Sequence, residues 1–241
     1  MIDLSGNSVN FQEFYNMFPF ELVDLTQAQR IDFYEYLLSK ALVERAHQRD
    51  ASITEESHEK IFPHIKNIIS WLRDTDFYTA PASTRYHDSF NGGLLYHTLN
   101  AYLQLATLKK VPKFEEVVKN QWWSAVFAIL VHDWCKIGRY ESYWKRVQDE
   151  KTEVWSKVLA YKYKDDNVGR LGHGPQSLVM AMQLCNTKLT SLTFEEMASI
   201  RWHMDNWDMS TYDAEDLKRC NEKIPMVRMI QFADQLAVTA Y

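Results

Sequence analysis

The sequence predicts an all-α fold, a helical bundle with one small β-hairpin inserted around residues 141–164. Three observations predict it. Apolar residues recur at helical spacing along most of the chain. Glycine and proline are scarce, at 7 and 6 of 241 residues, whereas a barrel or sandwich with many tight turns needs more of both. The length suits one large domain, or one domain with a small appendage.

Four helices are predicted before residue 135, over residues 27–48, 61–72, 94–108 and 115–134. The fourth contains WWSAVFAILVHDW and is apolar on nearly all sides, so we expect it to be the buried centre of the bundle. A loop at 80–93 ends in the pair Gly92-Gly93. We assign residues 1–50 to an N-terminal helical appendage, whose aromatic side chains favour a homo-oligomer, and residues 51–241 to the main domain.

The pattern changes between residues 140 and 164. The segment VWSKVLAYKYK mixes β-branched and aromatic residues with polar residues in partial alternation, which predicts the hairpin. We expect Trp155, Tyr161 and Tyr163 to pack against the helical body, and stacking on a nucleotide base is the alternative. Three helices are predicted to follow, over residues 176–185, 194–202 and 225–240.

Composition and charge exclude several classes of protein. The formal net charge is −5, so there is no overall attraction to nucleic acid, although a local basic pocket for a small phosphate compound stays open. No apolar run reaches the length of a membrane span, and the first residues, MIDLSGNSVN, have no basic-then-apolar pattern, so we expect no signal sequence. The three cysteines form no CxxC pair, so neither a disulfide framework nor a cysteine-rich zinc site is expected. We expect a cytoplasmic protein.

The dipeptide His132-Asp133 stands at the end of the most apolar predicted helix. Burying an ionisable pair is unfavourable unless a partner compensates it. A metal ion does so, since aspartate supplies a hard anionic oxygen and histidine a nitrogen. The alternative is structural: His132 caps the helix end and Asp133 forms an ion pair with Lys136. Taken alone, the dipeptide favours the structural alternative.

Four further residues change that balance. His97 lies early in a helix, His173 stands between two glycines at a helix start, and His203 lies at a helix end. Asp234 lies inside the apolar segment MIQFADQLAV. Each has a structural explanation on its own, as a core, loop or helix-end side chain. Together with the dipeptide they form the order H…HD…H…H…D, which independent coincidences explain poorly.

This set resembles the defining motif of the HD superfamily of metal-dependent phosphohydrolases, over roughly residues 60–241. The segments PASTRYHDSFNGGLLYHT, RLGHGPQS and IRWHMDNWD are similar to segments of phage and bacterial HD hydrolases, although HDWCK replaces the commoner HDIGK. The resemblance implies an HD-domain helical bundle with two metal ions that share one aspartate. It implies that the first ion is held by His97, His132, Asp133 and Asp234 and the second by Asp133, His173 and His203.

Four histidines with two aspartates suit two divalent transition metals, Fe, Mn, Co, Ni or Zn, better than magnesium, which prefers oxygen ligands. A bound divalent metal lowers the pKa of its water from 15.7 to about 7, so that a hydroxide nucleophile forms at neutral pH. The resemblance implies that Asp133 and Lys136 are catalytic, since the family's lysine at this position contacts the phosphate. Arg85, His87 and Arg139 are further candidates, with Lys136, for binding the substrate phosphate.

These features predict a phosphohydrolase that cleaves a phosphate ester or anhydride in a nucleotide: a deoxynucleoside triphosphate, a nucleoside monophosphate, or a cyclic or dinucleotide. The expected partner is a small-molecule nucleotide rather than a nucleic acid or a membrane. Three alternatives stay open. One is a 3′–5′ exonuclease on single-stranded nucleic acid, which the PAS…GGLLYHT segment favours and the acidic charge opposes. The others are a di-iron oxygenase with the same ligand order and a non-catalytic domain, against which the full ligand set argues.

Overall fold

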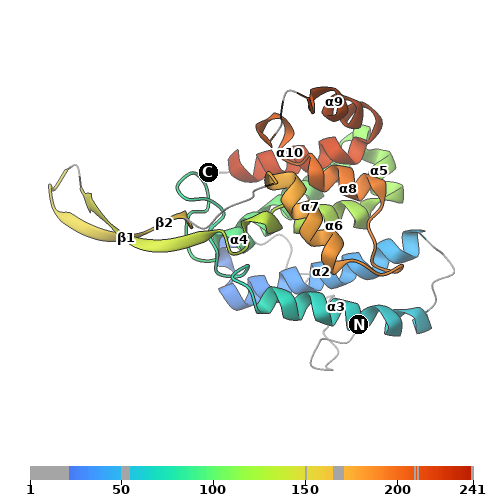
Figure 1. The fold of residues 1–241 in the computed structure, drawn as a ribbon, viewed down its shortest axis with the longest axis horizontal. Coiled ribbons are helices and arrows are strands. Elements are labelled where there is room, and N and C mark those ends of the chain that lie inside the picture. Colours follow the sequence, from blue (N-terminus) through green and yellow to red (C-terminus); the bar gives the residue numbers. More distant parts are fainter. Residues whose placement is uncertain are drawn as a thin grey trace.

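The structure, a computed structural model, describes residues 22–49, 55–149, 151–164, 171–208, 210 and 212–239. This part of the chain is mostly helical and carries one two-stranded antiparallel sheet, which confirms the predicted helical fold with a single hairpin (Figure 1). The α-helices are α2 (Gln27–Arg49), α3 (Glu55–Arg73), α4 (Gly93–Thr107), α5 (Glu115–Asn120), α6 (Trp122–Val131), α7 (His173–Leu184), α8 (Phe194–Arg201), α9 (Ala214–Lys223) and α10 (Pro225–Thr239). The strands are β1 (Tyr140–Gln148) and β2 (Trp155–Tyr163).

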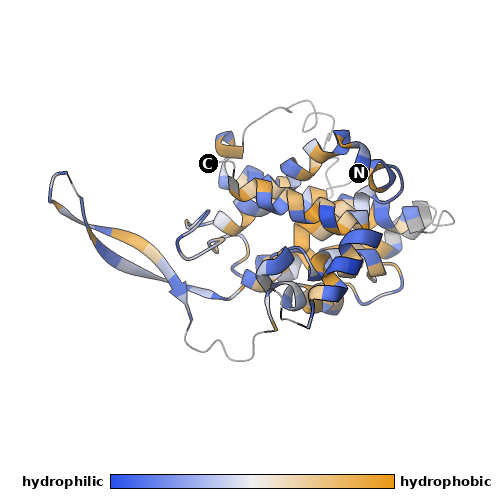
Figure 2. Ribbon diagram, turned by 90° about the horizontal axis from the view of Figure 1, so that it is seen from above, coloured by the Kyte–Doolittle hydropathy of each residue, from blue (hydrophilic) through white to orange (hydrophobic). Residues whose placement is uncertain are grey.

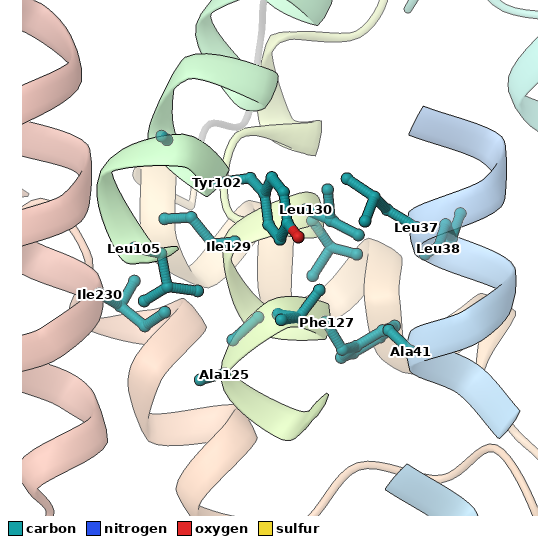
Figure 3. Close-up of a cluster of buried hydrophobic side chains, with 14 of the residues drawn as sticks. Leu37, Leu38, Ala41, Tyr102, Leu105, Ala125, Phe127, Ile129, Leu130 and Ile230 are labelled. Atoms are coloured by element: carbon teal, nitrogen blue, oxygen red, sulfur yellow. The ribbon is translucent and has the colours of Figure 1, made fainter. Parts of the chain in front are cut away.

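Helix α6 is the buried centre of the bundle, as its composition predicts. All of its ten residues except Trp123 are buried, and it packs against α2, α4, α8 and α10. Figure 3 shows side chains from the surrounding helices closing around α6, among them Leu38, Leu105 and Ile230. A helix that is surrounded on all sides needs apolar residues at nearly every position, which explains why this one has no polar stripe.

The single helix predicted over 115–134 is divided in the structure, so that prediction was wrong. Gln121 separates α5 from α6, because its backbone leaves the helical conformation (φ −135°, ψ 19°). Helix α6 then ends before His132, and the short 3-10 helix η4 (Trp134–Lys136) follows. The first break falls at Lys119-Asn120-Gln121 and the second at His132-Asp133. Neither segment contains glycine or proline, so the sequence carried no strong helix-breaking signal at these points. The second break places the His-Asp dipeptide in a turn and not on a helix face.

Helix α2 contributes to the same hydrophobic core and supports this turn. The hydroxyl group of Tyr34 donates to the carbonyl of Leu130 (3.0 Å) and accepts from the indole N–H of Trp134 (3.1 Å). These two residues flank the dipeptide on either side, so α2 holds the turn in place. The predicted domain boundary near residue 50 falls among residues 50–54, outside the described residues, as do residues 1–21 of the predicted appendage. The boundary therefore stays a prediction.

A buried ion pair joins α2 to α8. Arg45 Nη1 lies 2.6 Å from Glu196 Oε2, and both side chains are fully buried. The guanidinium group of Arg45 also lies over the ring of Phe127 in α6, 3.9 Å from its centroid. Glu196 completes a capping box with Thr193 at the start of α8. Helix α8, which leads to His203, is therefore fixed against both α2 and α6.

The hairpin projects from the helical body and does not fold back onto it (Figures 1 and 2). Its register pairs Tyr140 with Tyr163 at the base and Gln148 with Trp155 near the turn. The expectation that the hairpin aromatics pack against the body is wrong for Trp155 and Tyr163, which are 56% and 41% exposed, whereas Tyr161 is buried. Alternation in the sequence determines which residues share a face, but it does not determine what covers that face.

The C-terminal helices lie close to their predicted positions, with two differences. Helix α7 begins at His173, three residues before the predicted start, so this histidine belongs to its first turn. Helix α9 was not predicted, because Leu217 is its one buried residue and most of the remaining sequence is polar. Among the helices that the structure describes, none combines the length and the apolar character needed to cross a bilayer.

Candidate metal centre

The six predicted ligand side chains, far apart in the sequence, meet at one end of α6. They come from α4, α7 and α10 and from the turns that follow α6 and α8. They form three overlapping groups, in each of which the ligand atoms lie within 4.8 Å of one another. The groups are His97, His132 and Asp133; His132, His203 and Asp234; and Asp133, Cys135 and His173.

Two imidazoles face two carboxylates in one part of the centre. His97 Nε2 lies 3.0 Å from Asp234 Oδ1 and 3.5 Å from Asp133 Oδ2. His132 Nε2 lies 3.3 Å from Asp133 Oδ2 and 3.5 Å from Asp234 Oδ1. Nitrogen and oxygen ligands that are each about 2.0–2.2 Å from one ion stand about 3 Å apart. These four atoms therefore have the spacing of ligands to a single cation.

Asp133 lies between two sets of histidines. Its Oδ2 atom faces His97 and His132, whereas its Oδ1 atom faces His203, whose Nε2 atom is 3.7 Å away. The carboxylate is buried, so its charge is little screened by solvent. The two oxygens of this carboxylate therefore face imidazole nitrogens on different sides of the cluster.

The backbone orients two of the imidazoles in the same way. His132 Nδ1 donates to the carbonyl of Ile129 (2.7 Å), and His203 Nδ1 donates to the carbonyl of Ile200 (2.8 Å). A carbonyl oxygen only accepts hydrogen bonds, so each contact places a proton on Nδ1 and turns Nε2 toward the centre. In both cases the carbonyl lies three residues earlier, near the end of the preceding helix. The ends of α6 and α8 thus present their histidines through the same local geometry.

Several ligand atoms have no hydrogen-bond partner within the described part of the chain. They are His132 Nε2, Asp133 Oδ1, His173 Nδ1 and His203 Nε2. A buried polar atom without a partner costs about 1–3 kcal/mol, so four in one cluster call for a common partner. A cation satisfies imidazole nitrogens and a carboxylate oxygen together. The residues that are present therefore fit a metal centre.

The group around His173 includes a residue that the sequence analysis did not select. The Cys135 sulfur lies with ligand atoms of Asp133 and His173, and the backbone N–H of Cys135 donates to Ser177 Oγ in α7 (3.0 Å). Burial raises the pKa of the Cys135 thiol to about 12, so the thiol is protonated at neutral pH unless a cation binds it. The one signal in the sequence was the departure HDWCK from the commoner HDIGK, because the cysteine has no characteristic ligand spacing.

The electrostatics of the cluster favour a positive charge at its centre. Burial lowers the pKa of His132, but the negative charges of Asp133 and Asp234 outweigh burial and raise this pKa to about 10. Burial raises the pKa of the Asp133 and Asp234 carboxyls, but the positive charges beside them outweigh burial and hold each pKa well below its usual range. Burial lowers the pKa of His173 to about 4, which leaves this imidazole neutral, the form that binds metals.

The three predicted substrate-binding cations lie in different surroundings. Lys136 is buried, and its Nζ atom lies 2.6 Å from Asp133 Oδ2, so the ion pair of the structural alternative exists alongside the cluster. Arg139 is also buried, and its guanidinium lies 5.3 Å from the ring centroid of Tyr163. The pKa of His173 is lowered mainly by the burial of that imidazole, and the positive charge of Arg139 lowers it further. Arg85 is exposed, and its guanidinium donates to the hydroxyl of Tyr86 (3.0 Å) and not to the cluster.

The loop before α4 supplies His87 and a second residue that the sequence analysis missed. The His87 ring lies beside that of His97, with 4.9 Å between centroids and a tilt of 46° between the planes. Burial together with the charges of His97 and Lys136 lowers the pKa of His87 to about 4. Asp88 is buried, and its Oδ2 atom lies 3.7 Å from His97 Nδ1, on the side opposite the ligand atom Nε2. A signal was present, since His87-Asp88 repeats the dipeptide His132-Asp133.

Two glycines permit the close contacts that assemble the centre. A Cβ atom on Gly93 would lie 1.8 Å from the carbonyl oxygen of Asp88, and one on Gly174 would lie 1.9 Å from the carbonyl oxygen of Arg201. Only glycine has room at either position. Gly93 lets the preceding loop approach the start of α4. Gly174 lets the start of α7, which carries His173, lie against the end of α8.

Comparisons with known proteins identify no relative of the chain. No protein-family model matches it, and neither a curated protein nor a solved structure matches it significantly. A functional assignment therefore depends on the order of the ligand residues in the sequence and on the geometry of the cluster.

Proposed function

We propose that this chain is a metal-dependent phosphohydrolase of the HD type, which hydrolyses a phosphate ester or anhydride bond in a nucleotide. One observation carries the proposal: the residues that resemble the HD motif in the sequence also lie in one buried cluster. Neither the motif nor the cluster would suffice alone, since structural ion-pair networks also bring histidine and aspartate together. Their coincidence, together with the four ligand atoms that lack partners, supports a metal centre in preference to a structural ion-pair network.

The proposed ligands belong to two sets that share one aspartate. The orientation of the two Asp133 oxygens toward different histidines supports the sharing. Imidazole nitrogens outnumber carboxylates, which favours Fe, Mn, Co, Ni or Zn. Cys135 is a candidate additional ligand of the second set, where a thiolate would favour zinc. The first set is His97, His132, Asp133 and Asp234, and the second is Asp133, His173 and His203.

When bound, divalent ions lower the pKa of a coordinated water to about 7 and polarise a phosphoryl oxygen. The side chains around the centre bind and orient the substrate. Lys136 places a buried ammonium group beside Asp133, where it can exchange the carboxylate for a phosphoryl oxygen. Arg139 supplies a second positive charge toward His173, which suits a substrate with a further phosphate. His87 lies beside His97 and is neutral because its pKa is lowered to about 4, so it can form a hydrogen bond to the substrate there without carrying a charge.

The test combines metal analysis with a substrate screen. Protein purified without added metal is examined by elemental analysis and then incubated with nucleotides while phosphate release is measured. We expect Asp133→Asn to lower the metal content and to abolish turnover, because it removes the shared charge with little change of shape. Asp216→Asn removes an equal charge from an exposed position in α9 and should leave both quantities unchanged.

A second variant separates substrate binding from metal binding. Lys136→Met is expected to lower turnover while the metal stays bound, because the lysine contacts the substrate phosphate in this proposal. Full turnover by Asp133→Asn, or metal loss from Lys136→Met, would contradict these assignments. Repeating the assay without oxygen distinguishes hydrolysis, which continues, from an oxygenase reaction, which stops.

A further inference from the structure

The register of the hairpin divides its side chains between two faces. Directly opposed residues of paired strands share a face, and successive pairs alternate between the two sides. Five of the six aromatic residues in the strands lie on one side, which we call the aromatic face. Tyr143 is the exception and lies on the opposite face. The aromatic face carries Tyr140, Trp144, Trp155, Tyr161 and Tyr163.

The outer part of the aromatic face is uncovered. Trp144 is 67% exposed, and Leu159, which directly opposes it, is 45% exposed. Apolar segments run along the projecting hairpin in Figure 2, away from the apolar interior of the bundle. A contiguous exposed apolar surface of this kind usually marks a binding site. These side chains stabilise nothing in the described core, so their role is better sought in a partner.

Cations accompany these rings, and carboxylates do not. Arg146 and Lys157 directly oppose each other on the aromatic face, and the Arg146 guanidinium lies 5.5 Å from the ring centroid of Trp155. The one acidic residue of the two strands, Glu141, lies on the opposite face, where it pairs with Lys162 at 2.7 Å. Like charges that oppose each other across strands are unfavourable. The opposed cations therefore indicate an anionic partner.

The charge of this segment also differs from that of the whole protein. Residues 139–164 contain seven lysines or arginines and four aspartates or glutamates, whereas the chain as a whole carries a net charge of −5. The hairpin is thus a basic projection from an acidic protein. Such a basic segment attracts anions locally, although the protein as a whole is acidic.

We propose that the aromatic face binds single-stranded nucleic acid. Exposed indole and phenol rings stack on unpaired bases of any sequence, and interspersed cations contact the backbone phosphates. A duplex hides the base faces that these rings would contact. A second copy of the chain is a poorer occupant, because two aromatic faces packed together would juxtapose the opposed pairs Arg146 and Lys157 of both copies.

The aromatic face begins beside the candidate metal centre. Tyr140, at its inner end, is buried and follows Lys136 by four residues. Arg139 lies between them, and its guanidinium approaches the ring of Tyr163, the strand partner of Tyr140. A strand stacked along the hairpin therefore leads its phosphates toward the cluster. Delivery of a phosphodiester to that centre rests on the proposed function, whereas binding to the hairpin does not.

Binding is measured with the full chain by fluorescence anisotropy of labelled oligonucleotides of about 12 residues, within the usual range for such surfaces. Oligo-dT and oligo-rU are compared with a blunt DNA duplex, all in EDTA, so that metal-dependent cleavage does not contribute. We expect both single strands to bind and the duplex to bind more weakly. The ratio of the two single-strand affinities decides between DNA and RNA as the preferred partner.

Variants locate the surface. Trp144→Ala should weaken binding about tenfold, the loss typical of one stacked base. Tyr143→Ala, the neighbouring aromatic residue on the opposite face, is the matched control and should bind as the unaltered protein does. Replacing both Arg146 and Lys157 with alanine should reduce the slope of log K against log salt concentration by about 0.7 for each phosphate that the variant no longer neutralises. Asp133→Asn should bind normally in EDTA even where it abolishes turnover.

Three results would overturn the proposal: no saturable binding of either single strand at low salt, equal losses in Trp144→Ala and Tyr143→Ala, or equally tight binding of the duplex. Sedimentation of the same variants supplies a further test. If Trp144→Ala converts an oligomer to a monomer and no oligonucleotide binds, a second copy covers the face. Failure of oligonucleotide binding with intact nucleotide hydrolysis would refute this inference alone and leave the phosphohydrolase proposal standing.

Discussion

Replacing Glu196 with glutamine isolates the charge of the buried ion pair between α2 and α8. Arg45 and Glu196 are fully buried with 2.6 Å between Nη1 and Oε2, and Arg45 also donates to the carbonyl of Thr190. Glutamine keeps the shape and one oxygen acceptor, but it leaves the guanidinium without a counter-charge in the core. Removing one partner of a buried ion pair costs about 3–5 kcal/mol. Because the acceptor is retained, we expect a loss near the lower end, about 3 kcal/mol.

The loss is measurable by urea and thermal unfolding, followed by circular dichroism in chelator so that bound metal does not contribute. In a chain of this size 1 kcal/mol moves the midpoint by about 2–4 °C, so a decrease of about 6–12 °C is expected. Glu215→Gln is the control, since its partner Arg219 is nearly as close, at 2.8 Å against 2.6 Å, but the pair is largely exposed. An exposed pair contributes little. Equal stability of the two variants would refute the argument that buried charge fixes α8 on α2.

The contacts around the centre support three further predictions. In Gly174→Ala the new Cβ atom would lie 1.9 Å from the Arg201 carbonyl oxygen and must move to at least 3.4 Å, so α7 shifts away from α8. We expect turnover to fall about a hundredfold and elemental analysis to show one metal fewer. Normal turnover and metal content would refute the contact. Tyr34→Phe leaves the Trp134 indole N–H without its acceptor and should lower the free energy of unfolding, measured in urea, by about 1–3 kcal/mol. An unchanged free energy would mean that solvent satisfies the indole N–H and would refute this role of Tyr34. Removing metal with EDTA should lower the calorimetric unfolding temperature, since free metal at 100 times its Kd stabilises the fold by about 2.7 kcal/mol, and an unchanged temperature would argue against a resident metal.

The ligand residues could be selected from the sequence because each stands in an unusual local setting. Asp234 lies within MIQFADQLAV, and His132-Asp133 follows WWSAVFAILV, so ionisable groups interrupt apolar runs where burial needs compensation. Their meeting point could not be derived from spacing. His97 and Asp234 are 137 positions apart in the chain, yet 3.0 Å separates their ligand atoms. Only the resemblance to the HD motif grouped them before the structure did.

The features that the sequence did not reveal depend on contacts between distant segments. The break at Gln121 precedes the apolar run of α6, and no glycine or proline marks it in the sequence. Tyr34 supports the turn that carries the dipeptide, although 96 positions separate it from Leu130, so its role has no local signal. Trp155 has the alternation typical of a half-buried strand, but no element of the described chain covers it. Periodicity reports the face on which a side chain lies, and packing decides what that face meets.

One turn joins the candidate metal centre to the hairpin. Lys136 ends η4, Gly138 adopts a left-handed conformation (φ 70°), and β1 begins two residues later. The Gly138 N–H donates to Asp76 Oδ1 (2.6 Å), and the Arg139 carbonyl accepts from the N–H of Lys164 (3.2 Å). These backbone contacts fix the direction in which the hairpin leaves the body, so the outer aromatic side chains do not set it. Substitutions at the outer end of the hairpin therefore test nucleic-acid binding without moving the ligands, whereas substitutions in this turn disturb both.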